Sequence, residues 1–120
     1  MADMQIESGI EGVPAIEIEI ITSGNGQKPL SGDQVSMHYV GTYPAGEEFD
    51  SSRGRGQPFG FKLGAGMVIK GWDLIVADMC VGDRWSATIP YQLAYGEGGH
   101  PAGIPPKQDL VFDMELLDIA

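Results

Sequence analysis

The sequence is poor in cysteine, histidine and basic residues. A single cysteine, Cys80, excludes an internal disulfide and a multi-cysteine metal cage, and it favours a reducing cytoplasm as the location. The two histidines, His38 and His100, show no metal-ligand spacing. Seven basic residues against seventeen acidic ones give a formal net charge of −10. This charge disfavours a nucleic-acid-binding protein, because phosphate contacts need clustered Lys and Arg.

Long apolar runs and a targeting segment are also missing. The longest apolar run covers residues 74–77, far short of the roughly 20 residues that a membrane span needs. The first residues are acidic and lack the basic and apolar regions of a secretory signal. We therefore expect no membrane partner, and the high net charge favours a monomer.

Glycine, in contrast, is abundant. The 120 residues contain 18 glycines and 8 prolines without a fixed period, and these gather between residues 54 and 66 and between 96 and 106. Glycine adopts positive φ without steric cost, so this distribution is typical of turns in a compact sheet protein. The length suits one domain with a single core.

Periodicity predicts the secondary structure. Alternation of apolar and polar residues predicts strands over residues 15–22, 35–40, 59–63, 83–89 and 109–119, with a short edge piece at 48–50. Residues 51–58 are expected to form a loop or bulge. One helix is predicted over residues 70–79, where the apolar residues follow the i, i+3, i+4, i+7 spacing: Trp72, Ile75, Val76 and Met79.

These elements predict an α+β fold, with an antiparallel β-sheet wrapped around one short α-helix. Residues 1–11 show no comparable pattern and are expected to be a flexible extension of a domain spanning residues 12–120. A loop over residues 91–106 is long for a compact domain, and such loops are usually functional or disordered.

Catalytic motifs that depend on a nucleophile or a phosphate loop are absent. Ser51, Ser52 and the histidines lie outside any nucleophile motif, and the glycine-rich stretches match no phosphate-binding pattern. Aromatic residues instead come from several separate segments, and the long loop adds Tyr95, His100 and Ile104. Core packing explains part of this set, and an apolar pocket for a small ligand explains the rest.

Six separated motifs resemble those of the FKBP-type peptidyl-prolyl cis–trans isomerases, of the single-domain class that binds tacrolimus and rapamycin. They are VSMHYVG at 35–41, FDSS at 49–52, QPFGF at 57–61, VIKGW at 68–72, AYG at 94–96, and IPP with LVFD at 104–106 and 110–113. Their order and spacing follow the family over roughly residues 12–120.

The resemblance implies a rotamase that turns X–Pro peptide bonds without a covalent intermediate, a metal or a cofactor. Its catalytic residues would be Tyr39, Asp50, Trp72 and Phe112. Residues that bind the substrate or a macrolide would be Phe49, Arg55, Phe59, Val68, Ile69, Tyr95, His100 and Ile104. The implied partners are prolyl-containing polypeptides and tacrolimus- or rapamycin-type macrolides, and the implied role is assistance in protein folding.

Two positions depart from the family pattern. Leu93 stands where an aromatic residue is usual, and Gly103 replaces a bulky apolar residue at the tip of the loop. Both changes predict weaker contact with residues flanking the proline or with macrolides. A module that grips prolyl or apolar segments without turnover, or a purely structural module, therefore remains an alternative to the enzyme.

Overall fold

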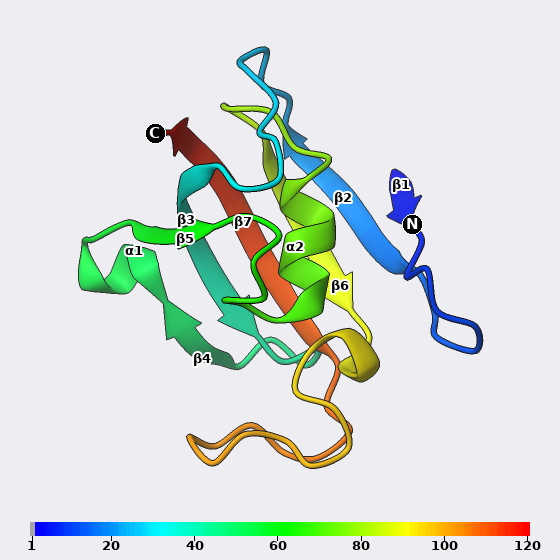
Figure 1. The fold of residues 1–120 in the computed structure, drawn as a ribbon. Coiled ribbons are helices and arrows are strands. Elements are labelled where there is room, and N and C mark those ends of the chain that lie inside the picture. The colour runs from blue at the N-terminus through cyan, green and yellow to red at the C-terminus, as the bar shows by residue number, and fades with distance from the viewer. Residues whose placement is uncertain (1) are drawn as a thin grey trace.

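The computed structural model describes residues 2–120, which form a seven-stranded antiparallel sheet, one α-helix of two turns and two shorter helical turns. The strands are β1 (Met4–Ile6), β2 (Ile16–Thr22), β3 (Gln34–Thr42), β4 (Glu48–Ser51), β5 (Phe59–Lys62), β6 (Arg84–Ile89) and β7 (Leu110–Ile119). The helical segments are α1 (Ser52–Arg55), α2 (Lys70–Val76) and a 3₁₀ turn over Tyr91–Leu93. Figure 1 shows α2 lying across one face of the sheet.

The sheet is organised around β3 and β7. The strand order is β1-β2-β6-β7-β3-β4, and β5 also pairs with β3. The amino-terminal half of β3 pairs with β5, and its last residues pair with β4. Together β4 and β5 therefore form one interrupted edge strand, and α1 lies in the interruption. This break turns the residues of α1 back toward the end of β4.

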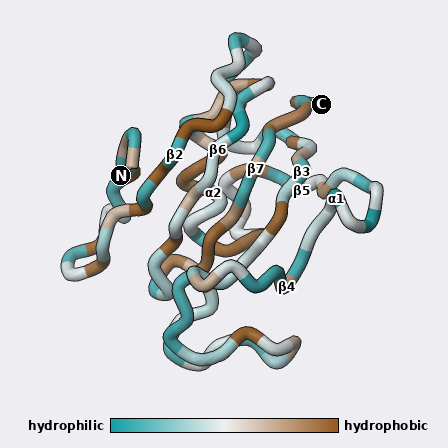
Figure 2. The backbone as a smooth tube through the Cα atoms, turned by 180° about the vertical axis from the view of Figure 1, so that it is seen from behind, coloured by the Kyte–Doolittle hydropathy of each residue, from teal (hydrophilic) through white to brown (hydrophobic). Residues whose placement is uncertain are grey.

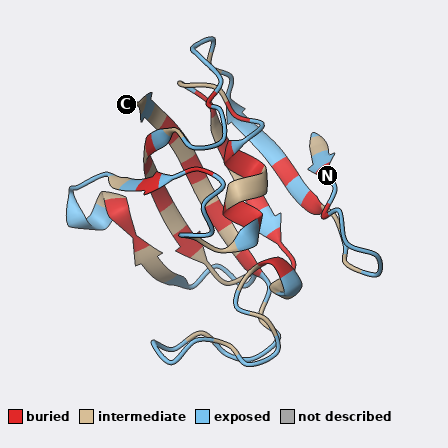
Figure 3. Ribbon diagram, in the orientation of Figure 1, coloured by how far each residue is buried: buried red, intermediate tan, exposed pale blue. Residues whose placement is uncertain are grey.

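The core lies between the sheet and α2. Hydrophobic and hydrophilic residues alternate along β2 in Figure 2, and the residues buried on β2, β3, β6 and β7 form the bands shown in Figure 3. A strand with this alternation buries one face, and a short amphipathic helix gains its stability by covering that face. The four apolar helix-spaced residues from Trp72 to Met79 are all buried.

The predicted fold class is confirmed, whereas several element boundaries differ. The α-helix ends at Val76 instead of residue 79, because Asp78 and Met79 donate to carbonyls three residues back and tighten the last turn. The predicted loop at 51–58 contains the single turn α1, and the loop at 91–106 begins with a 3₁₀ turn.

The amino-terminal segment contributes a strand that the periodicity did not indicate. Three-residue β1 is too short to show alternation, yet it pairs with β2 and buries the Ile6 side chain. The mobility of residues 1–11 and the domain boundary at residue 12 stay predictions.

Candidate active site: an aromatic cavity between helix and sheet

Three buried aromatic residues form the floor of a cavity of about 170 Å³ between α2 and the sheet. Tyr39 comes from β3, Trp72 from α2 and Phe112 from β7, and they are 7%, 5% and 4% exposed. Their rings meet edge to face, with centroids 4.9 Å apart for Tyr39–Trp72 and 5.3 Å apart for Trp72–Phe112. Aromatic pairs favour this arrangement, so the floor is rigid.

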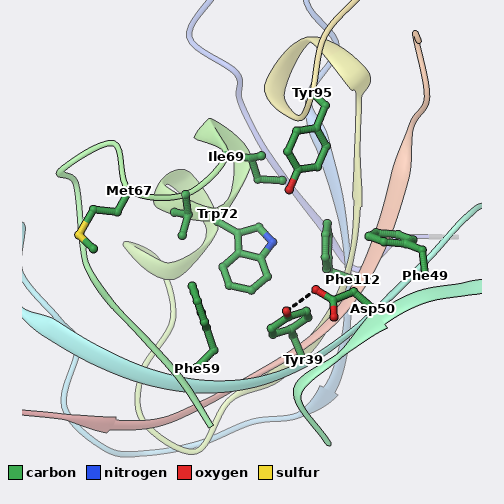
Figure 4. Close-up of a pocket in the computed structure, with 10 residues that line it drawn as sticks. Tyr39, Phe49, Asp50, Phe59, Met67, Ile69, Trp72, Tyr95 and Phe112 are labelled. Atoms are coloured by element: carbon green, nitrogen blue, oxygen red, sulfur yellow. Dashed lines mark hydrogen bonds between the residues drawn. The ribbon is translucent and has the colours of Figure 1, made fainter. Parts of the chain in front are cut away.

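The Trp72 indole is buried without a polar partner. Its Nε1 atom has no hydrogen-bond acceptor among residues 2–120, and Figure 4 shows this edge of the indole turned toward Phe112. A buried donor without an acceptor is costly, and the face of an aromatic ring offsets only part of that cost. The indole also packs against the rings of Tyr39, Phe59 and Phe61, so packing rather than a hydrogen bond holds it in place.

Three residues paired across neighbouring strands connect the floor to Asp50, the only charged residue of the cavity lining. Asp50 on β4 lies opposite Gly41 on β3, and Gly41 lies opposite Phe112 on β7. A Cβ atom on Gly41 would lie 2.7 Å from Cζ of Phe49 and 2.8 Å from Cε1 of Phe112. Glycine at this position therefore leaves the space that both rings occupy.

The carboxylate of Asp50 is held by a small polar network at the edge of the floor. The Tyr39 hydroxyl donates to Oδ2 at 2.5 Å, as Figure 4 shows, and the Arg55 guanidinium donates to Oδ1 at 2.5 Å. Arg55 also donates to the Tyr39 hydroxyl at 3.0 Å. The Ser51 hydroxyl accepts the Gly54 N–H and so caps α1, the turn that carries Arg55.

This network fixes the ionisation of both partners. Burial and the hydrogen bond to Asp50 hold the pKa of Tyr39 above its ordinary value of 10.0. Partial burial by itself would raise the pKa of Asp50, but the hydrogen bonds from Tyr39 and Arg55 outweigh it and hold this pKa below 3.8. At neutral pH the hydroxyl is therefore protonated and the carboxylate charged.

The long loop forms the rim of the cavity together with the segment before α2. A second cavity of about 350 Å³ adjoins the first and shares Phe49, Asp50 and Tyr95 with it. His100 and Ile104 line this second cavity and are joined by backbone hydrogen bonds between them. The His100 ring meets the Tyr95 ring edge to face, with centroids 5.0 Å apart.

The structure brings eleven of the twelve sequence-predicted site residues into the linings of these two adjoining cavities, and the twelfth, Arg55, bonds to two of them. Nine of them line the first: Tyr39, Phe49, Asp50, Phe59, Val68, Ile69, Trp72, Tyr95 and Phe112. Arg55 contributes through its bonds to Asp50 and Tyr39, and His100 and Ile104 lie in the second cavity.

Sequence reasoning missed some lining residues. Met67 lines the first cavity, and Tyr43 and Ala102 line the second. Gly103, which the sequence analysis placed at the tip of the loop, lines the second cavity as well. The signal for Met67 was its place directly before the VIKGW motif. Leu93, by contrast, is fully buried and lines neither cavity.

A serine–histidine pair does form, outside both cavities. The His38 Nδ1 atom lies 2.9 Å from the Ser52 hydroxyl, which also accepts the Tyr39 N–H at 2.7 Å. Ser52 is completely buried and could not reach a substrate, so this pair ties α1 to β3. Residues 2–120 hold no cluster of three or more His, Cys, Asp or Glu placed to bind a metal ion. No helix in the same range is long and apolar enough to cross a membrane.

Comparison with known proteins identifies the family. The family model described as FKBP-type peptidyl-prolyl cis-trans isomerase matches residues 25–117. Over 93 residues the chain is 55% identical to the peptidyl-prolyl cis-trans isomerase FPR2 of Saccharomyces cerevisiae, covering 77% of this chain and 69% of the yeast protein. Over 102 residues it is 52% identical to FK506-binding protein 1 of Dictyostelium discoideum, covering 85% of this chain and 95% of that protein.

A solved structure agrees with these relatives. The crystal structure of AtFKBP13 matches with a TM-score of 0.83 and 35% sequence identity, covering 88% of this chain and 93% of that chain. The chain belongs to the FKBP-type peptidyl-prolyl cis-trans isomerase family. It is an enzyme that interconverts the cis and trans isomers of X–Pro peptide bonds.

Proposed function

We propose that the cavity floored by Tyr39, Trp72 and Phe112 is where the X–Pro bond rotates, with Asp50 as the fourth catalytic residue. The supporting observation is a buried aromatic floor next to one carboxylate whose charge is already balanced by the Arg55 guanidinium and the Tyr39 hydroxyl. Such a site accepts the apolar proline ring and supplies polarity at only one edge.

The mechanism follows from the barrier of the reaction. Rotation breaks the resonance of the amide against a barrier of about 18–20 kcal/mol, without breaking any covalent bond. The planar imide has a polar carbonyl that water solvates, whereas the twisted imide has lost much of this polarity. An apolar site therefore destabilises the planar form more than the twisted one, which lowers the barrier.

A fixed donor can hold the substrate while it rotates. Ile69 lines the cavity, and its N–H donates to no acceptor among residues 2–120. A hydrogen bond that lasts through the rotation must go to a carbonyl that keeps its place relative to the proline ring. The carbonyl of the proline itself meets this condition, whereas the carbonyl before the proline moves with the rotation. We assign the Ile69 N–H to the proline carbonyl.

The proposal extends to macrolide ligands, the oligomeric state and the cellular location. Several relatives are named FK506-binding proteins, and this name together with the aromatic cavity supports macrolide binding by this chain. The remaining predicted residues of the two cavities would contact the groups that flank the proline or the macrolide ring. The proposed role is that of a monomer assisting protein folding in a reducing cytoplasm, which the net charge and the lone cysteine support.

The test compares two carboxylates that are each paired with an arginine. Asp50→Val removes the carboxylate of the cavity, and Asp113→Val removes one that pairs with Arg84 away from both cavities. We expect Asp50→Val to lower kcat/KM for an Ala-Leu-Pro-Phe peptide by about tenfold, or about 1.4 kcal/mol. Asp113→Val should keep the rate of the folded protein. Full turnover in Asp50→Val would contradict the proposed site.

A further inference from the structure

Met67 stands apart from the rest of the cavity lining because it is 62% exposed, although its neighbours in the lining are mostly covered. A lone exposed apolar residue is ordinary on a protein surface. Met67 is not isolated, however, since it borders the cavity beside Val68 and Ile69. Figure 4 shows it on the side of Trp72 opposite to Asp50.

The loop that carries Met67 is held in place. At its start, Leu63 is buried and exchanges backbone hydrogen bonds with Gly32 and Asp33. The Gly64 N–H donates to Oδ1 of Asp73 on α2 at 2.9 Å, which ties the loop to the helix. Gly66 adopts a φ of 72°, a conformation that turns the chain immediately before Met67. The backbone therefore places Met67 at the mouth of the cavity, with most of its side chain open to solvent.

The two ends of the cavity mouth differ in chemistry. One end continues into the second cavity past Phe49, Asp50 and Tyr95. The other end is bordered by Met67 and Val68, and it has no charged residue in its lining. A peptide bound through its proline enters over one end and leaves over the other.

This inference rests on the proposed function, in which the proline carbonyl accepts the Ile69 N–H. Of the two directions that this hydrogen bond allows, the inference takes the one in which the chain after the proline continues past Val68 and Met67, which line the cavity next to Ile69. The chain before the proline then lies toward Asp50 and the second cavity. The residue after the proline therefore meets the exposed thioether.

We propose that Met67 is a specificity-determining residue, which favours a large apolar residue immediately after the proline. Contact would cover apolar surface on both side chains, and this burial is favourable in proportion to its area. Methionine adapts its shape to different partners, so leucine and phenylalanine both fit. A charged residue at the same position would lose water without gaining a polar partner, so glutamate is disfavoured.

The test uses peptides Ala-Leu-Pro-Zaa, with Leu, Ala or Glu as Zaa, and measures kcat/KM by protease-free NMR exchange. We expect the wild-type protein to prefer Leu over Ala by about fivefold, equivalent to about 1 kcal/mol. Met67→Gln should reduce this ratio to near one, and Met67→Leu should preserve it. Leu30→Gln removes a 70% exposed apolar residue that lines neither cavity, and it should change neither the ratio nor the rates.

Three outcomes separate the possible failures. An unchanged Leu-to-Ala ratio in Met67→Gln would overturn the role of Met67 alone. A second peptide series, Ala-Xaa-Pro-Phe with Leu, Ala or Glu as Xaa, varies the residue before the proline. A Met67→Gln effect confined to this second series would also overturn the role of Met67, because the assigned direction would be reversed. A full rate in Asp50→Val with all three peptides would instead contradict the proposed site. A ratio that collapses in Met67→Gln, together with a lowered rate and an unchanged ratio in Asp50→Val, supports both proposals.

Discussion

The floor and the rim of the cavity are built in opposite ways. The floor residues Tyr39, Trp72 and Phe112 come from regular elements, are at most 7% exposed and pack against one another. The rim residues Met67 and Tyr95 come from loops and are 62% and 37% exposed. We therefore expect changes in the floor to affect folding and turnover together, and changes in the rim to affect only contacts with the parts of a substrate beyond the proline.

This difference separates two tasks. A low-polarity surface that favours a twisted imide must be dry before the substrate arrives, so it belongs in the core. Recognition of flanking residues requires side chains that a passing peptide can reach, so it belongs on loops over a rigid scaffold. The polar network around Asp50 lies between the two regions, because Tyr39 belongs to the floor and Arg55 to the surface.

The largest expected effect tests whether the floor acts in catalysis as well as in folding. The two tryptophans, Trp72 and Trp85, are both 5% exposed, but only Trp72 lines the cavity. We expect Trp72→Ala and Trp85→Ala each to lower the free energy of unfolding by about 3–5 kcal/mol. Only Trp72→Ala should also lower kcat/KM, by about 100-fold or about 2.7 kcal/mol. Urea denaturation gives the stability, and exchange rates measured well below the unfolding midpoint give the activity.

Equal activity of the two folded tryptophan variants would remove the distinction between the floor and the remaining core. The cavity would then be a consequence of packing, without a part in lowering the barrier.

A smaller effect is expected at Gly41 of β3, next to which the rings of Phe49 and Phe112 lie. In Gly41→Ala the new methyl group would push against the rings of Phe49 and Phe112, since the nearest atom of each ring lies under 3.0 Å from the place that the added Cβ would take. Overpacking of this kind costs about 1–3 kcal/mol of stability. Displacement of the two rings should lower kcat/KM by about tenfold.

The control for Gly41→Ala is another strand glycine. A Cβ on Gly60 of β5 would first meet the flexible amide of Gln34 at 3.3 Å, so Gly60→Ala should leave both stability and turnover nearly unchanged. If Gly41→Ala loses stability and keeps its rate, the position of the Phe112 ring does not matter for the reaction.

The sequence predicted the floor better than the rim, for a physical reason. Period-two and helical patterns identify buried faces, so the alternation along β3 and β7 and the spacing from Trp72 onward predicted which residues face the core. Family motifs then assigned roles to those residues. Loop positions carry no periodic signal, and Met67, Tyr43 and Ala102 were found as lining residues only from the structure. Short β1 was missed because pairing with β2, rather than its own pattern, forms it.

The smallest expected effect lies at the boundary between the two regions, in the hydroxyl of Tyr39. Tyr39→Phe keeps the ring in the floor and removes the hydrogen bond to Asp50, so kcat/KM should fall only about threefold. Asp50 has a folded pKa below its unfolded value, so its ionised form stabilises the protein above pH 3.8, and this contribution is lost as the pH falls through the folded pKa. Loss of the Tyr39 donor raises that folded pKa, so the stabilisation should shrink. Unfolding measured at pH 2–7 checks this, with Tyr91→Phe, which lines neither cavity, as the control.

The wild-type rate should be flat between about pH 6 and 8, because neither Asp50 nor Tyr39 changes its charge there. A steep change of rate in that window would mean that a titrating group takes part in the reaction. Catalysis by an apolar floor, with the rim only contacting the substrate, would then be wrong.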